Sequence, residues 1–289
     1  MSKSVGSLFL VSVMLALLQT VPAWADSLTP AVPQNDDLDA VLWDQTSVEA
    51  KGADLGAYAL GELRLDQALA DKGWTAATEQ TGDYQNLPPA IILDVDDTVL
   101  NTSAYQAWTV VKGTSYGGKT WDAYVHAEKD VPIPGAIDFL KYAASKGVTI
   151  FYVTNRTEPQ EAPTVEEMTK MGFPMGDGKT DTFLASGEQP DWKSAKGNRR
   201  AFIAKNYRIV LLFGDNMGDF TDDYNGSVAE RDAVFAKDAA HWGHDWIVIA
   251  NPTYGSFQSA PFGNDYSKSV DEQRKEEEGV LSPWSGPAQ

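Results

Sequence analysis

Four short, mainly apolar runs recur along the chain, and polar, loop-forming residues follow each of them. Runs of this length without hydrophobic–polar alternation are typical of strands buried on both faces of a parallel sheet. They lie at residues 90–93, 148–153, 208–213 and 246–250. Apolar residues at helical spacing lie between the first two runs, at 134–147, and before the third, at 195–206. Strand, helix and strand in this order predict an α/β fold built on a parallel sheet.

The remaining patterns divide the chain into segments. Between residues 38 and 74 apolar residues recur at spacings of three, four and seven, which predicts one or two amphipathic helices that end near Lys72 and Gly73. A charged run at 271–278 predicts a solvated helix. We expect a signal peptide at 1–25, a flexible leader at 26–36, a helical accessory segment at 37–88, a core at 89–262 with an insert at about 101–132, and a charged tail at 263–289.

The insert after the first predicted strand is rich in aromatic residues and contains several glycines. Its rings belong to Tyr105, Trp108, Tyr116, Trp121 and Tyr124. We expect an irregular segment that forms a small cap and walls a pocket, because so many rings directly follow a strand end. The alternative, that these rings only fill the interior of the accessory segment, stays open.

The first 25 residues have the features of a secretory signal peptide. Lys3 precedes an apolar run at residues 8–18, and Ala23 and Ala25 form a cleavage site before Asp26. The run is too short to span a bilayer. We expect cleavage, export to the periplasm or secretion, and no stable membrane anchor afterwards. A retained N-terminal anchor is the competing interpretation.

The charge of the chain narrows the classes of partner. Its formal net charge is −18, and cleavage after residue 25 would remove one lysine and make it −19. Such a surface repels nucleic-acid phosphates, so we expect no nucleic-acid polymer as a partner. A small phosphorylated ligand can still bind at a local site that contains a cation. Cysteine is absent, which excludes disulfides, thiolate metal sites and a cysteine nucleophile.

Side chains suited to chemistry follow the predicted strands. Asp94 and Asp96 follow the first, Thr154 ends the second, and Asp215 and Asp219 follow the third. The carboxyl ends of parallel strands meet at one edge of the sheet, where ligands bind in open α/β folds. The alternative for residues 94–98 is a solvated acidic turn that caps a helix.

These residue types favour a magnesium site that binds phosphate. Carboxylates without histidine or cysteine are ligands suited to Mg²⁺ rather than to zinc, and crowded carboxylates need a cation to stay ionised. Thr154 and a lysine would complete a cradle for phosphoryl oxygens. Lys193 is the preferred lysine and Lys196 is its rival.

The histidines give little support to other chemistries. His126, His241 and His244 are the three histidines of the chain. His241 and His244 are spaced for one helix face, but without further ligands a surface or core role is favoured over a metal site. A Ser-His-Asp hydrolase has no suitably spaced partner here.

In their order along the chain these residues resemble the four motifs of the haloacid dehalogenase (HAD) superfamily of phosphohydrolases. The motifs are Asp94-x-Asp96-x-Thr98, a strand ending in Thr154, Lys193, and Gly214-Asp215-Asn216-x-x-Asp219. From about residue 41 to 258 the chain is similar to class C bacterial acid phosphatases, the group that includes the lipoprotein 5′-nucleotidases. The resemblance implies a HAD-like parallel sheet flanked by helices, with a small, mainly helical cap or accessory domain.

The resemblance also implies a Mg²⁺-dependent acid phosphatase that hydrolyses small-molecule phosphomonoesters. Asp94 would attack phosphorus and form an aspartyl-phosphate, and Asp96 would act first as acid and then as base. Magnesium would be held by Asp94, the backbone carbonyl of Asp96 and Asp215, with Asp219 as a further ligand or an anchor.

Substrate contacts follow from the same resemblance. Thr154 and Lys193 would bind the phosphoryl oxygens. Trp121 and Tyr254 match an aromatic pair that stacks on the base in nucleotide-hydrolysing members, so a nucleoside 5′-monophosphate is the preferred substrate. A homodimer stays open as the assembly.

Two departures and two alternatives accompany the resemblance. The chain lacks the cysteine that lipoprotein members carry after the signal peptide, which implies a form without a lipid anchor. The family's Tyr-Gly-x-Trp-Glu run reads Tyr-Gly-Ser-Phe-Gln at 254–258. The alternatives are a broad acid phosphatase without nucleoside preference and a non-catalytic relative that binds or stores phosphate; the intact Asp94 speaks against the second.

Overall fold

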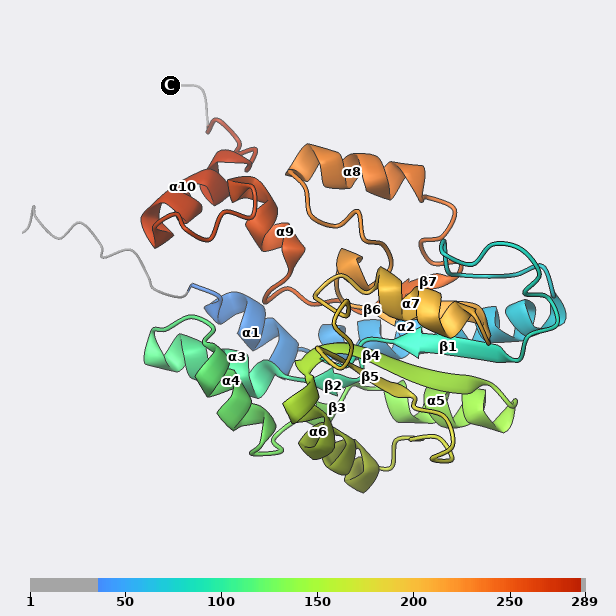
Figure 1. The fold of residues 1–289 in the computed structure, drawn as a ribbon. Coiled ribbons are helices and arrows are strands. Elements are labelled where there is room, and N and C mark those ends of the chain that lie inside the picture. Colours follow the sequence, from blue (N-terminus) through green and yellow to red (C-terminus); the bar gives the residue numbers. More distant parts are fainter. Residues whose placement is uncertain (1–35, 287–289) are drawn as a thin grey trace, which may run out of the picture. The chain divides into compact units, whose positions relative to one another are not determined.

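The computed structural model describes residues 36–286 (Figure 1). The predicted signal peptide and its cleavage site, and nearly all of the predicted leader, lie outside these residues. Within the described range, no helix combines the length and the apolar composition that a membrane span requires.

A five-stranded sheet forms the centre of the fold, and its neighbouring strands are all parallel. Its spatial order is β5-β4-β1-β6-β7. The strands are β1 (Pro89–Leu93), β4 (Thr149–Thr157), β5 (Phe183–Ser186), β6 (Arg208–Gly214) and β7 (Trp246–Val248). The four predicted strands are confirmed. The four-residue strand β5 was missed, since a run this short carries little periodicity.

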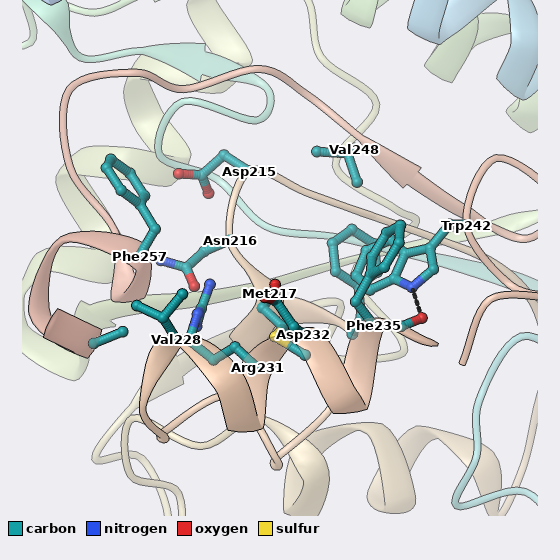
Figure 2. Close-up of a pocket in the computed structure, with 12 residues that line it drawn as sticks. Asp215, Asn216, Met217, Val228, Arg231, Asp232, Phe235, Trp242, Val248 and Phe257 are labelled. Atoms are coloured by element: carbon teal, nitrogen blue, oxygen red, sulfur yellow. Dashed lines mark hydrogen bonds between the residues drawn. The ribbon is translucent and has the colours of Figure 1, made fainter. Parts of the chain in front are cut away.

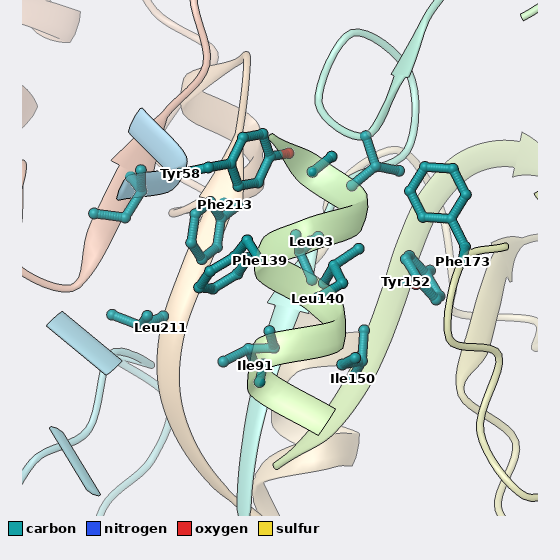
Figure 3. Packing of buried hydrophobic residues seen from close by; sticks show 14 of the residues in the cluster. Tyr58, Ile91, Leu93, Phe139, Leu140, Ile150, Tyr152, Phe173, Leu211 and Phe213 are labelled. Carbon is teal, nitrogen blue, oxygen red and sulfur yellow. The ribbon is translucent and has the colours of Figure 1, made fainter. Parts of the chain in front are cut away.

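Apolar side chains of the sheet alternate between two faces, and each face is covered by helices. Ile91 and Leu93 of β1 pack on one side with Phe139 and Leu140, which lie on the helix that crosses this face (Figure 3). Ala90 and Ile92 pack on the other side, in a cluster with Ile203, Phe220 and Trp246. The central strand is therefore buried on both faces, as its uninterrupted apolar sequence predicts.

Two N-terminal helices, α1 (Leu38–Thr46) and α2 (Val48–Ala70), confirm the helical pattern predicted for residues 38–74. Ser47 separates them and accepts a hydrogen bond from the backbone N–H of Ala50, as an N-cap does. α2 lies close to the sheet at Gly61, where a Cβ atom would come within 2.7 Å of the Phe213 ring. The hydroxyl of Tyr58, also on α2, donates to the backbone carbonyl of Thr98 at 2.6 Å. The accessory helices thus support the loop that follows β1.

The insert after β1 is mainly helical rather than irregular. It contains the short antiparallel pair β2 (Leu100–Asn101) and β3 (Val131–Pro132), and between them α3 (Ser103–Lys112) and α4 (Gly118–Val125). Tyr105 is buried and its ring contacts those of Trp108, Tyr116, Trp121 and Tyr124. The rings pack against one another around Tyr105, and this packing stabilises helices that the weak periodicity of a glycine-bearing segment does not reveal.

The remaining helices follow the strands. They are α5 (Ala136–Ser145), α6 (Glu158–Met171), α7 (Gly197–Ala204), η2 (Met217–Asp219), α8 (Val228–Lys237), α9 (Ser256–Ser259), η3 (Ala260–Phe262) and α10 (Val270–Gly279). The helices predicted at 134–147, 195–206 and 271–278 are confirmed as α5, α7 and α10. α5 begins two residues after Pro134 because its N-cap, Gly135, has φ 89°, which glycine adopts without strain.

Candidate active site

The register of the sheet brings the predicted carboxylates and Thr154 to one edge. Leu93 of β1 pairs with Tyr152 of β4 and with Phe213 of β6. Asp94 comes directly after Leu93. Thr154 and Asp215 each come two residues after the partners of Leu93. The backbone N–H of Asp94 also donates to the carbonyl of Phe213 at 3.1 Å. Side chains that lie far apart in the sequence therefore meet at the carboxyl ends of the three central strands.

Three carboxylates at this edge can share a cation. Asp94, Asp215 and Asp219 each offer one oxygen, and these three oxygens lie within 4.8 Å of one another. Burial, followed by the neighbouring carboxylates, raises the pKa of Asp215 well above its usual value. Burial also raises the pKa of Asp94 to about 7, despite the opposing effect of Lys196. An all-oxygen donor set of three carboxylates, whose charge one lysine offsets only in part, fits a hard divalent metal ion.

Asp219 reaches the cluster because the loop after β6 turns tightly. Its carboxylate accepts a hydrogen bond from the backbone N–H of Asn216 at 2.9 Å. It also lies against Gly214, where a Cβ atom would come within 2.3 Å of the Asp219 carboxylate. Glycine at position 214 is required for this close approach, which gives the Gly-Asp sequence of the motif a physical reason.

Lys196, not Lys193, is the lysine at the carboxylates. The Lys196 ammonium forms an ion pair with Asp94 and lies 2.7 Å from the Asp219 carboxylate. Lys196 is buried at the N-terminus of α7, whereas Lys193 is exposed and contributes its backbone carbonyl to the guanidinium of Arg199. The geometry thus contradicts the preference for Lys193. The Lys-Ser-Ala phrase favoured Lys193, but the lysine that reaches the cluster comes three residues later, at the N-cap of α7.

Asp96 lies in a network centred on the buried Arg156. The guanidinium donates twice to one Asp96 oxygen, at 2.9 and 2.8 Å, and once to Asp130 at 2.6 Å. A further N–H donates to the hydroxyl of Thr164 on α6 at 2.9 Å. The guanidinium also lies 5.6 Å from the centre of the Trp121 ring. Burial raises the pKa of Asp96, and Arg156 opposes this rise.

Two further buried arginines hold the segments that carry the site. Arg199 donates to the backbone carbonyl of Thr154 and to the side chain of Asn155. Arg200 donates to the backbone carbonyl of Asp219 at 3.0 Å and pairs with Glu79 at 2.7 Å. Sequence reasoning missed Arg156, Arg199 and Arg200. Arginine on a helix is usually solvated, so nothing in the pattern marks Arg199 and Arg200 as buried, whereas the position of Arg156 two residues after Thr154 was a usable signal.

The loop of Asp94 is packed rather than solvated. Asp97 and Thr98 are buried, and Asp97 has φ 50°, an uncommon value for a residue other than glycine. The Asp97 carboxylate accepts hydrogen bonds from the N–H and the hydroxyl of Thr102 at 2.9 and 2.6 Å. It also accepts one from the hydroxyl of Tyr254. The alternative of a solvated acidic turn is therefore wrong.

The two aromatic residues expected to stack on a base occupy different surroundings. Trp121 belongs to the ring cluster of the cap and lies against Arg156. Tyr254 donates to Asp97, and no ring contact between Trp121 and Tyr254 occurs within residues 36–286. Tyr116 connects the two, because its ring contacts Trp121 and lines the same pocket as Tyr254.

Other candidate groups lie away from this edge. His241 and His244 both flank Asp245, at 2.7 and 3.5 Å, and their rings stack on Trp246 and Trp74. This agrees with the structural role favoured for them. A second acidic trio, with oxygens within 4.8 Å of one another, consists of Glu161, Asp181 and Glu188.

A mainly apolar pocket lies beside the carboxylates. Its volume is about 320 Å³, and Asp215 and Asn216 lie at one side of it, with Phe235 and Trp242 opposite (Figure 2). Phe257 lies next to Asp215 in this view. Rings and aliphatic side chains supply most of its lining, so it offers few groups for binding a charged phosphate.

The fold and the site together define a class of protein. Three carboxylates, a buried lysine and a threonine at the carboxyl ends of a parallel sheet form the arrangement of a HAD-type phosphohydrolase. Two structures of the class C acid phosphatase from Bacillus anthracis, one with tungstate bound, are similar to this chain, with TM-scores of 0.75. Their sequence identities are 34% and 35%, and each match covers 86% of this chain and 98% of that chain.

The sequence identifies the family. Residues 45–257 match the profile of the family described as HAD superfamily, subfamily IIIB (acid phosphatase). The chain belongs to this family and is a phosphoric monoester hydrolase. The resemblance inferred from the motifs is confirmed, as is the fold it implied.

Proposed function

We propose that this chain is an exported, Mg²⁺-dependent acid phosphatase that hydrolyses phosphomonoesters through an aspartyl-phosphate on Asp94. The observation that carries this proposal is the convergence of Asp94, Asp215, Asp219 and Lys196 at one edge of the sheet. Tungstate binding by the similar enzyme from Bacillus anthracis adds support, because tungstate, like phosphate, is a tetrahedral oxyanion.

The side chains support a two-step displacement. A carboxylate oxygen of Asp94 forms a bond to phosphorus while the bond from phosphorus to the leaving oxygen breaks, and Asp96 supplies the proton that the leaving oxygen takes up. Asp96 then accepts a proton from the water that attacks the aspartyl-phosphate, which releases phosphate and restores Asp94. Arg156 orients Asp96 for both transfers.

Charge on the phosphoryl group is met by Lys196 and Thr154. Lys196 would move its ammonium from Asp94 to a phosphoryl oxygen, and the hydroxyl of Thr154 would donate to another. Asp94, Asp215 and Asp219 would hold Mg²⁺, with the backbone carbonyl of Asp96 as the further ligand that the resemblance implies. When bound, the ion neutralises phosphoryl charge and keeps the carboxylates ionised.

The preferred substrate is a nucleoside 5′-monophosphate. Tyr254 supports this preference, since it lies beside Asp97 and lines a pocket with Tyr116. A broad acid phosphatase without nucleoside preference is the second candidate. The signal-like sequence at residues 1–25 supports export. The net charge of −18 disfavours nucleic-acid polymers and favours small phosphate esters as substrates.

Substitutions at the two key positions test the mechanism. Asp94→Asn removes the nucleophile and should lower kcat by at least about 10³-fold. Lys196→Met should lower kcat/KM by about 10²- to 10³-fold because it removes a cation at the phosphoryl group. The matched control is Lys193→Met, which should stay within about twofold of the wild type. Release of phosphate from p-nitrophenyl phosphate in excess Mg²⁺ is the measurement.

The controls separate catalysis from folding. Each variant should retain the far-UV circular dichroism spectrum of the wild type. Full activity of Asp94→Asn would refute the nucleophile. A loss in Lys193→Met as large as that in Lys196→Met would refute the choice between the two lysines.

A further inference from the structure

A second pocket lies between the cap and the C-terminal helices. Its volume is about 380 Å³, within the range of about 300–1,000 Å³ that is usual for small-molecule sites. α3 and the loop after it form one side, and α9, η3 and α10 form the other. The residues used below are Gln106, Tyr116, Tyr254, Gln258 and Tyr266.

Two tyrosines connect this pocket with the loop that carries Asp94 and Asp96. Tyr254 lines the pocket, and its hydroxyl donates to the carboxylate of Asp97, the neighbour of Asp96. Tyr116 lines it as well, and its ring contacts Tyr105 and Trp121 at centroid distances of 6.1 and 6.2 Å. The leaving oxygen would take its proton from Asp96, and both tyrosines lie near enough to Asp96 to interact with its charge. This pocket is therefore placed to receive the leaving group.

The walls combine exposed rings with side-chain amides that have no partner. Tyr116 and Tyr266 are 67% and 72% exposed and offer flat faces. Among residues 36–286, no hydrogen bond engages the side-chain amide of Gln106 or of Gln258. Gln273 differs, because its amide donates to the carbonyl of Lys268 at 2.9 Å. Arg274 is also engaged, in ion pairs with Asp36 and Glu278.

We propose that Gln106 and Gln258 select the leaving group in this pocket by binding the edge of a heteroaromatic ring. The proposal rests on the proposed function. A purine or pyrimidine presents donors and acceptors side by side, and a glutamine amide offers both, as in its bidentate pairing with adenine. Ring faces of tyrosine stack on any base. A sugar or glycerol phosphate has no flat face to stack and no such edge.

Gln258 lines the pocket with a side chain that carries both a hydrogen-bond donor and an acceptor. Gln258 lies just beyond residues 45–257, where the family profile ends. A carboxylate only accepts hydrogen bonds, whereas an amide also donates, so glutamine at 258 widens the set of ring edges that can bind. Tyr266, on the same side of the pocket, follows Gln258 in the C-terminal part of the chain.

The test compares two substrates in variants of the full enzyme. Gln106→Leu and Gln258→Leu should each lower kcat/KM for adenosine 5′-monophosphate by about tenfold, because each removes one hydrogen bond and leaves a polar ring edge unpaired. Hydrolysis of ribose 5-phosphate should stay within about twofold. Gln85→Leu, an exposed glutamine before β1, is the matched control and should change neither substrate.

A binding measurement that involves no hydrolysis tests the pocket separately from the proposed phosphatase activity. Adenosine, which lacks phosphate, should bind the wild type in a calorimetric titration. The variant that combines Gln106→Leu and Gln258→Leu should bind adenosine at least about tenfold more weakly. Equal losses for both substrates, no loss for either, or no binding of adenosine would overturn the pocket assignment. If the wild type bound adenosine with this dependence on the glutamines but hydrolysed neither substrate, the pocket would stand and the proposed function would fail.

Discussion

Asp54 shows at the residue scale how burial without a partner changes a carboxyl group. It lies on α2, is only 8% exposed, and has no hydrogen-bond partner among the described residues. Burial, with a smaller effect of the nearby Asp44, raises the pKa of Asp54 from 3.8 to about 6. Asp94 shows a related rise, but there the neighbouring Lys196 opposes it. The same residue type thus behaves as an isolated acid on α2 and as part of a charged centre at the sheet edge.

The Asp54 pKa makes stability depend on pH. Because the folded-state pKa lies above the unfolded value, protonation favours the fold; this stabilisation is complete below about pH 3.8 and is lost as the pH rises through about 6. Asp54→Asn should therefore be more stable than the wild type by about 1–2 kcal/mol at pH 7.5, a figure below the full value of the shift because water reaches the pocket beside Asp54. At pH 4 the two proteins should differ by less than about 0.5 kcal/mol.

Urea unfolding of both proteins at the two pH values measures this difference. The difference in the free energy of unfolding between wild type and variant isolates Asp54, because the other titrating groups are common to both proteins. A difference that is the same at pH 4 and pH 7.5 would show that the Asp54 carboxyl does not titrate in the way its burial implies.

At the scale of elements, Arg156 joins the core to the cap. It lies on β4, its guanidinium bonds Asp96 after β1 and Asp130 just before β3, and it contacts Thr164 on α6. Four segments therefore depend on one planar group with five donors. Lysine keeps the charge but carries one compact ammonium, which cannot make all these contacts.

Arg156→Lys should therefore loosen the cap. We expect a loss of about 2–3 kcal/mol in the free energy of unfolding, since a buried carboxylate would lose its partner. Arg64 is the control: among residues 36–286 its side chain bonds only the carbonyl of Gly243 and the side chain of Gln67. Arg64→Lys should therefore cost less than about 1 kcal/mol. Denaturant unfolding monitored by tryptophan fluorescence measures both. Equal losses of stability in the two variants would show that the guanidinium of Arg156 is not what joins these elements.

At the scale of the whole molecule, the acidic centre couples metal binding to stability. Asp94, Asp215 and Asp219 lie together, with Lys196 as the cation in contact with two of them. Folding therefore concentrates negative charge that a bound divalent ion relieves. An ion that binds only the folded chain stabilises it in proportion to its occupancy.

Magnesium should raise the melting temperature of the enzyme. At about 100 times Kd the stabilisation is about 2.7 kcal/mol, or about 5–10 °C for a chain of this size, and EDTA should reverse it. Asp215→Asn should abolish the shift. Asp181→Asn, in the second acidic trio, should retain it. Differential scanning fluorimetry with and without Mg²⁺ decides the matter, and a shift that survives in Asp215→Asn but disappears in Asp181→Asn would move the metal site to the second trio.

The amino-acid sequence by itself determined four of the five strands of the parallel sheet, the helices α1, α2, α5, α7 and α10, and the edge where the chemistry lies. It did so because buried strands need uninterrupted apolar runs, and because their carboxyl ends must meet at one edge. For the same reason Asp94, Asp96, Thr154, Asp215 and Asp219 could be assigned to that edge from their positions after the strands.

Only the tertiary structure decided which side chains touch. Lys196 and Lys193 are three residues apart and of the same type, so only the turn into α7 determines which of them reaches Asp94. Arg156, Arg199 and Arg200 are buried because partners from distant segments surround them, and no local pattern records such partners. The helices of the cap likewise depend on rings that meet across the insert. Local sequence encodes periodicity, whereas contacts between distant segments exist only once the chain has folded.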